Sequence, residues 1–98
     1  MDELRVRRGG RDGPPLLLLH GLGATGDVWR GWDPLLAQRW PGRWAAPDLP
    51  RHGGSPGLPG YGFEDLAEAV APLLEPAGRT VVLGHSLGGV VALALAAA

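Results

Sequence analysis

Ser86 stands in a five-residue pattern whose spacing can support chemistry, because a glycine lies two positions before it and two positions after it. Gly84-His85-Ser86-Leu87-Gly88 follows one short apolar run and leads into another, which predicts a sharp turn from a strand into a helix. Such a turn strains the serine backbone and exposes its hydroxyl above the sheet edge. Gly84 and Gly88 are expected where neighbouring backbone leaves no room for a β-carbon. The pattern predicts a nucleophilic serine, and the alternative is an ordinary glycine-rich turn with a solvated serine.

The helix expected from Leu87 onward would direct its free N–H groups back toward Ser86. Those donors, together with the positive end of the helix dipole, suit the oxyanion that forms when a serine attacks an ester carbonyl.

A base for Ser86 is harder to find in this sequence. A serine hydroxyl needs a histidine to accept its proton and a carboxylate to hold that histidine. The residues that follow Ser86 contain neither a histidine nor a carboxylate. His85 cannot serve, because neighbouring side chains at a strand end point to opposite faces. We therefore expect the chain to be catalytically inactive by itself.

Length and composition restrict the classes of function. The 98 residues suffice for one small domain. A net charge of −1 without a long run of like charge gives no electrostatic case for binding nucleic acid or an anionic membrane. The sequence has no Cys, hence no disulfide or thiolate metal site, and no cofactor is expected. Without a secretory signal or a run long enough to span a bilayer, the expected location is cytoplasmic.

The elements that must position Ser86 alternate between strands and helices, which predicts an α/β fold with a mainly parallel sheet and flanking helices. Short apolar or alternating runs predict strands at Leu4–Arg8, Leu16–Leu19, Arg43–Pro47 and Thr80–Leu83. Helical spacing and caps predict helices from Asp33, as N-cap, to about Trp40, over Phe63–Leu74, and from Leu87 onward. Gly9–Pro15 is a predicted turn, and the segments Leu22–Gly31 and Asp48–Tyr61 are predicted loops.

Three segments together resemble the consecutive signatures of the α/β-hydrolase fold family. They are L-L-L-L-H-G-L-G at 16–23, D-L-P-R-H-G-G-S at 48–55 and G-H-S-L-G-G at 84–89, in the family's order and spacing. The resemblance implies that the four predicted strands match an early antiparallel strand and the third, fourth and fifth strands of the family. It covers nearly all of this chain and less than half of the family's domain. Residues 1–98 are thus expected to be the N-terminal portion of a single α/β-hydrolase domain.

The resemblance also implies roles for individual residues. The family's nucleophile falls on Ser86, and its oxyanion hole falls on the backbone N–H groups of Leu22 and Leu87. Roles in supporting these loops fall on His20, Gly21, Gly84 and Gly88. In the family, the counterpart of His20 is structural and is not the base. His52 matches a loop-shaping D-x-x-x-H-G-x-S segment, in which Arg51 departs from a frequent glycine and leaves the loop shape open.

The activity implied is hydrolysis of ester, lactone or thioester bonds of a small acyl substrate through an acyl-enzyme. A serine at position 86 argues against dehalogenase and epoxide hydrolase relatives, which carry a carboxylate there. Esterase, lactonase, thioesterase, acyltransferase and cofactor-free haloperoxidase relatives remain open. Trp29, which follows the oxyanion glycines, is a candidate contact in the acyl pocket, while the other tryptophans are expected to pack. A non-catalytic ligand-binding or interaction fragment is the alternative that differs only in activity.

A dinucleotide-binding fold is a further alternative, because Gly21 to Gly26 satisfies G-x-G-x-x-G after an apolar strand. Asp48 lies 22 residues beyond Gly26, where an acid would bind the ribose. A helix should then begin within the fingerprint, whereas Asp33-Pro34 predicts a helix that starts well downstream.

The last strand of the sequence is expected to lie at an edge of the sheet. Thr80–Leu83 has no later strand in this sequence to pair with, and the helix after it is apolar all round. Unpaired apolar edges favour association between chains. We therefore expect the chain to aggregate, to dimerise or to form a molten state when it is expressed alone.

Overall fold

The computed structural model of the chain describes residues 3–76 and 78–97. Strands, α-helices and short 3₁₀ helices (η) alternate along these residues. In chain order they are β1 (Val6–Gly10), β2 (Leu16–Leu19), η1 (Gly26–Trp32), α1 (Asp33–Arg39), β3 (Arg43–Pro47), α2 (Phe63–Val70), η2 (Ala71–Leu73), β4 (Val81–Gly84) and α3 (Leu87–Ala97). No helix within the described ranges is long and apolar enough to cross a membrane.

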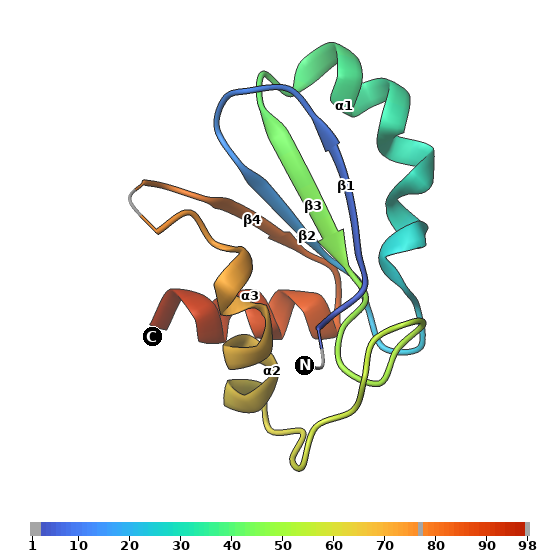
Figure 1. Cartoon of the computed structure of the whole chain (residues 1–98), viewed down its shortest axis with the longest axis vertical. Helices are drawn as coiled ribbons and strands as arrows, with labels where there is room; N and C mark the ends of the chain where they lie inside the picture. Colours follow the sequence, from blue (N-terminus) through green and yellow to red (C-terminus); the bar gives the residue numbers. More distant parts are fainter. Residues whose placement is uncertain (1–2, 77, 98) are drawn as a thin grey trace.

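The strands form one sheet in the order β1-β3-β2-β4. β2 runs parallel to both β3 and β4, and β1 pairs antiparallel with β3. Helices α2 and α3 cover one face of this sheet, while η1 and α1 cover the other (Figure 1). The predicted α/β fold with a mainly parallel sheet is therefore confirmed.

β2 is the strand around which both halves of the core form. Leu17 and Leu19 belong to the apolar cluster beneath α2 and α3, and Leu16 and Leu18 belong to the cluster beneath η1 and α1. Successive side chains of a strand point to opposite faces, so a strand covered on both sides needs an unbroken apolar run. None of the four leucines is more than 7% exposed.

β1 begins and ends two residues later than predicted. The glycines that had suggested a turn are part of the strand, and Gly9 pairs with Trp44 of β3. A β-carbon on Gly9 would overlap the Trp44 indole, so glycine makes room for that ring. Arg5 lies outside the strand, although its carbonyl accepts the Asp48 N–H at 2.8 Å. β4 begins and ends one residue later than predicted, at Val81 and Gly84.

Three predictions about the helices and the loops between them need correction. The predicted helix Phe63–Leu74 ends at Val70 and continues as η2, because Pro72 has no N–H with which to continue α-helical bonding. The predicted loop Leu22–Gly31 contains the start of η1, which begins at Gly26. Thr25 caps this helix by accepting the Asp27 N–H at 3.2 Å. Asp33 is the first residue of α1 and not its N-cap, and that helix ends at Arg39.

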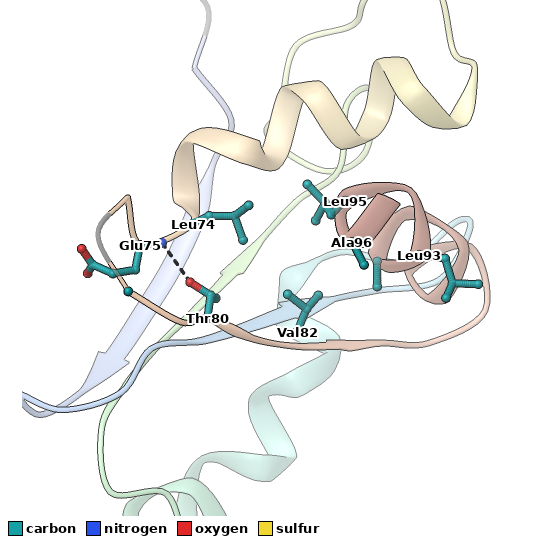
Figure 2. Close-up of a pocket in the computed structure, with 9 residues that line it drawn as sticks. Leu74, Glu75, Thr80, Val82, Leu93, Leu95 and Ala96 are labelled. Atoms are coloured by element: carbon teal, nitrogen blue, oxygen red, sulfur yellow. Dashed lines mark hydrogen bonds between the residues drawn. The ribbon is translucent and has the colours of Figure 1, made fainter. Parts of the chain in front are cut away.

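β4 lies at the edge of the sheet, as predicted. Among the described residues its only strand partner is β2. Val81 is 50% exposed, and Leu93 of α3 is 72% exposed. Figure 2 shows the open groove of about 490 Å³ between β4, α3 and the segment after α2, with Val82, Leu93 and Leu95 among its lining side chains. An apolar strand edge and an apolar groove thus lie next to each other.

We expect the chain to sediment as a dimer or larger species through this edge, because unpaired backbone groups beside apolar side chains favour intermolecular strand pairing. Val81→Lys should shift the population toward monomer. Leu35→Lys is the matched control, since Leu35 is 51% exposed on α1 and is not among the residues that line the two grooves beside β4. Sedimentation velocity on the three proteins measures the effect. A sharp monomer boundary for the unmodified chain, with dispersed amide NMR signals, would contradict this prediction.

Candidate active site

Ser86 occupies the turn between β4 and α3, with its side chain exposed. Its φ of 56° lies in the left-handed region, which costs a residue with a side chain about 1 to 2 kcal/mol. The first turn of α3 stabilises this backbone conformation, because the Ser86 carbonyl accepts the N–H groups of Gly89 at 2.9 Å and Val90 at 3.2 Å. The serine side chain therefore projects from the carboxyl edge of the sheet at the N-terminus of α3.

Gly84 and Gly88 allow this turn to pack closely against its surroundings. A β-carbon on Gly84 would lie 2.5 Å from the backbone nitrogen of Gly89. A β-carbon on Gly88 would lie 2.5 Å from the carbonyl carbon of Leu19 and 2.7 Å from the carbonyl oxygen of His20. The neighbours in both cases are backbone atoms that cannot rotate away. This is the steric reason predicted for glycine at both positions.

The loop after β2 approaches the same turn. A β-carbon on Gly21 would lie 3.4 Å from the Ser86 Cβ and 3.1 Å from Nδ1 of His85. Leu22 follows Gly21 and is 78% exposed, and Leu87 follows Ser86 as the first residue of α3. Neither the Leu22 N–H nor the Leu87 N–H donates a hydrogen bond to any residue in the ranges 3–76 and 78–97. Two unpaired backbone donors thus lie on the two segments that meet at Ser86.

His20 is fully buried behind this loop, with both ring nitrogens occupied. Nδ1 lies 2.7 Å from the Gly21 carbonyl oxygen, and Nε2 accepts the Leu49 N–H at 2.9 Å. Because Leu49 must donate, Nε2 carries the lone pair and Nδ1–H donates to Gly21. Burial lowers the pKa of His20, and the hydrogen bond to Gly21 opposes that effect only in part. His20 is therefore neutral near pH 7 and has no free nitrogen to offer Ser86.

The bond from His20 also sets the direction of the Leu22 N–H. The Gly21 carbonyl is held by His20 and by the Ala24 N–H at 3.1 Å. In a planar trans peptide the C=O and the N–H point in opposite directions. Holding the Gly21 oxygen toward the buried ring therefore turns the Leu22 N–H away from it.

Asp48 connects the two loops on this side of the sheet, a role that sequence reasoning missed. Its fully buried carboxylate accepts the Gly26 N–H at 2.7 Å, the Gly54 N–H at 2.9 Å and the Arg5 guanidinium at 3.2 Å. Burial alone would raise the pKa of Asp48, but the bonds from Gly54, Gly26 and Arg5 outweigh burial and lower it. A charged, fully bonded Asp48 thus fixes the loop after β2 against the loop after β3.

His52 contacts the same loop from the other side, through a partner that could not be identified from the sequence. Its Nε2 accepts the Gly23 N–H at 3.0 Å, and its Nδ1 lies 3.1 Å from the Pro50 carbonyl oxygen. The ring centroids of His52 and His20 are 4.9 Å apart. Arg51 adopts a φ of 63°, so it takes up the conformation that glycine would favour at this position.

No imidazole is joined to Ser86 by a hydrogen bond within the described ranges. The same residues bring together no three His, Asp or Glu side chains that would hold a metal ion. Trp29 lines an open apolar groove of about 390 Å³ with Val28, Trp32 and Leu83, next to Gly84 and His85. The described part of the chain thus provides a serine, two free N–H donors and a neighbouring apolar surface, without a base.

Comparison with known proteins places this arrangement in a family. A family model described as the alpha/beta hydrolase family matches residues 16–98. The chain belongs to the α/β-hydrolase family. Its resemblance to that family is therefore confirmed, and its four-stranded sheet corresponds to a part of the family's fold.

Two similar relatives and one solved structure illustrate the match. The magnesium-chelatase 30 kDa subunit of Rhodobacter capsulatus is 45% identical over 95 residues, which covers 93% of this chain and 33% of that protein. A pimeloyl-acyl-carrier-protein methyl ester esterase of Aeromonas hydrophila is 47% identical over 96 residues, covering 96% of this chain and 36% of the esterase. The structure of a marine microorganism esterase matches with a TM-score of 0.86 at 30% identity, covering 99% of this chain and 37% of the other.

This α/β-hydrolase chain therefore spans about a third of the length of the relatives it matches. The dinucleotide alternative finds no support in the site. Asp48, the residue assigned to a ribose, is fully buried and bonded to Gly26, Gly54 and Arg5. A helix, η1, does begin at the last glycine of the fingerprint, Gly26, so the prediction that the first helix starts well downstream is wrong.

Proposed function

We propose that the chain is the N-terminal portion of a serine hydrolase that cleaves ester, lactone or thioester bonds of a small acyl substrate through an acyl-enzyme. The observation that carries this proposal is the pairing of an exposed, backbone-strained Ser86 with the unpaired N–H groups of Leu22 and Leu87. Family membership supports hydrolytic chemistry. An esterase among the relatives supports an acyl substrate.

In the proposed reaction, the Ser86 Oγ attacks the carbonyl carbon of the substrate and its proton passes to a base. The carbonyl oxygen becomes an oxyanion that accepts hydrogen bonds from the Leu22 and Leu87 N–H groups, aided by the N-terminus of α3. Collapse of the intermediate breaks the bond to the leaving alcohol or thiol, which takes the proton. Water then attacks the acyl-serine and releases the acid.

The base in this scheme lies outside the 98 residues. Both ring nitrogens of His20 and of His52 are engaged by backbone groups. The remaining histidine, His85, precedes Ser86, and no acid or histidine follows Ser86 in the sequence. We therefore propose that these residues supply the nucleophile and the oxyanion donors, and that a longer chain supplies the histidine and the carboxylate.

A fusion protein tests this function. The chain is joined at Ala98 to the segment that follows the matched stretch in the Aeromonas hydrophila esterase, which is its 47% identical relative. The fusion should hydrolyse p-nitrophenyl acetate, and a panel of lactone and thioester substrates then ranks the acyl class. Ser86→Ala should abolish turnover. Ser55→Ala is the control for loss of a serine hydroxyl elsewhere in the chain, since the Ser55 hydroxyl donates to the Asp48 carbonyl. Turnover that survives Ser86→Ala would refute the proposal.

A non-catalytic binding role is the second candidate, favoured by the absence of an available imidazole beside Ser86 among the described residues. It predicts that the fusion folds but remains inactive.

A further inference from the structure

The loop that carries Leu22 is held on both sides by imidazole rings. His20 fixes the peptide before Leu22 through the Gly21 carbonyl, at 2.7 Å. His52 fixes the peptide after Leu22 through the Gly23 N–H, at 3.0 Å. Because each peptide is planar, these two bonds restrict the backbone on either side of the Leu22 Cα.

The tautomer of His52 suits this contact. A backbone N–H can only donate, so Nε2 of His52 must carry its lone pair toward Gly23. The ring proton then lies on Nδ1, where the Pro50 carbonyl accepts it at 3.1 Å. A buried ring, His20, packs against the same side chain with centroids 4.9 Å apart. The His52 acceptor is therefore oriented by two independent contacts.

Gly23 depends on hydrogen bonds for its position, which makes its contact with His52 important. Its φ of 81° is a conformation that glycine adopts readily, and a β-carbon there would meet nothing within 4 Å. Steric packing therefore does not hold this residue in place. The hydrogen bond to His52 and the bonds of the following Ala24 and Gly26 N–H groups constrain the loop instead.

We propose that His52 is a positioning residue, which holds the Leu22 N–H in the orientation that binds the oxyanion by accepting the Gly23 N–H. The inference rests on the proposed function, because it concerns the donor that the reaction uses. His52 makes no contact with the substrate in this role and acts through the backbone of the loop. The required property is an acceptor at the position of Nε2, and neither charge nor proton transfer is needed.

Two variants of the chain separate an acceptor from a ring. His52→Phe keeps an aromatic ring against His20 but removes the acceptor. His52→Gln loses the ring but offers a side-chain amide oxygen as acceptor at a similar distance from the backbone. Hydrogen exchange at the Gly23 amide, followed by mass spectrometry on the 98-residue chain, should accelerate about fivefold to tenfold in the Phe variant, as expected for the loss of one hydrogen bond. The Gln variant should restore protection.

The same substitutions in the fusion protein test the consequence for reaction. The rate constant for phosphonylation of Ser86 by a fluorophosphonate should fall by up to about a hundredfold in the Phe variant, the size expected when a reacting geometry shifts by about 1 Å. The fluorophosphonate concentration that gives half of the maximum phosphonylation rate should stay constant. The Gln variant should recover most of the rate constant. Equal loss in both variants would indicate a merely structural role and overturn the inference. Unchanged Gly23 exchange in the Phe variant would overturn it as well.

Failure of the proposed function gives a different result. If the unmodified fusion does not react at Ser86, the oxyanion role of Leu22 is refuted, and the positioning role falls with it. The exchange rates then show only whether His52 stabilises the loop.

Discussion

The 98-residue chain alone is expected to hydrolyse p-nitrophenyl acetate no faster than buffer, and its Ser86 should not react with a fluorophosphonate. The two backbone donors at Leu22 and Leu87 are each worth about a hundredfold to a thousandfold in an assembled enzyme. They act here on a neutral hydroxyl, however, because both nitrogens of His20 and of His52 are bonded to the backbone. Loss of the base in serine hydrolases costs about a millionfold in turnover.

The comparison that isolates this effect uses one preparation of the chain and one of the fusion, each with its Ser86→Ala variant. Ester hydrolysis is followed by release of p-nitrophenol, and labelling by the probe is followed in a gel. The Ser86-dependent rate is the difference between each protein and its variant, which removes the background. Robust Ser86-dependent turnover by the chain alone would mean that a histidine leaves its backbone partners and reaches the serine.

Gly88→Ala is expected to prevent folding, both in the chain and in the fusion. The added methyl group would lie 2.5 Å from the carbonyl carbon of Leu19 and 2.7 Å from the carbonyl oxygen of His20, in the strand end against which α3 packs. Relieving this overlap means moving α3 away from β2, and because the neighbours are backbone atoms we expect a cost at or beyond the upper end of the range of about 1 to 3 kcal/mol typical of overpacking. Small domains have only about 5 to 15 kcal/mol of stability in total. We expect little soluble protein and no cooperative thermal transition.

Gly89→Ala is the matched control for this prediction. A β-carbon on Gly89 would lie 3.5 Å from the nearest atom, the Gly84 carbonyl oxygen, which is an ordinary contact. Alanine favours an α-helix over glycine by up to about 1 kcal/mol. The circular dichroism melting temperature of Gly89→Ala should therefore equal or exceed that of the unmodified chain. Equal melting temperatures for Gly88→Ala and Gly89→Ala would contradict the packing assigned to Gly88.

The parts of the fold that were predictable from sequence are those that local pattern determines. β2 and β3 have their predicted bounds, because a run buried on both faces reads as continuous apolar sequence and turn residues delimit it. The placement of glycine around Ser86 was also predictable, since the motif and its steric reason coincide. The sequence did contain the signal that ends α2, namely Pro72, and the prediction of a longer helix overlooked it.

Other features depend on partners that are distant in sequence. Gly9 was predicted to lie in a turn, because no neighbouring residue in the sequence indicates that the Trp44 indole lies against it. The acceptor role of His52 depends on a backbone N–H 29 residues upstream, and that of Asp48 on Gly26 and Arg5. Such bonds arise only when the loops after β2 and β3 meet at the same edge of the sheet. An aspartate and a histidine within a Gly-rich loop were nevertheless reasonable candidates for hydrogen bonds that join the two loops.

Trapping the acyl-enzyme tests the central claim most directly. The fusion is mixed with p-nitrophenyl acetate, quenched in acid within the burst phase, digested and examined by peptide mass spectrometry. We predict one acetyl group on the peptide that contains Gly84 to Gly88, assigned to Ser86 by fragmentation and missing from Ser86→Ala. An active fusion whose acetyl group lies on another residue, or which forms no covalent intermediate, would contradict the assignment of Ser86 as the nucleophile.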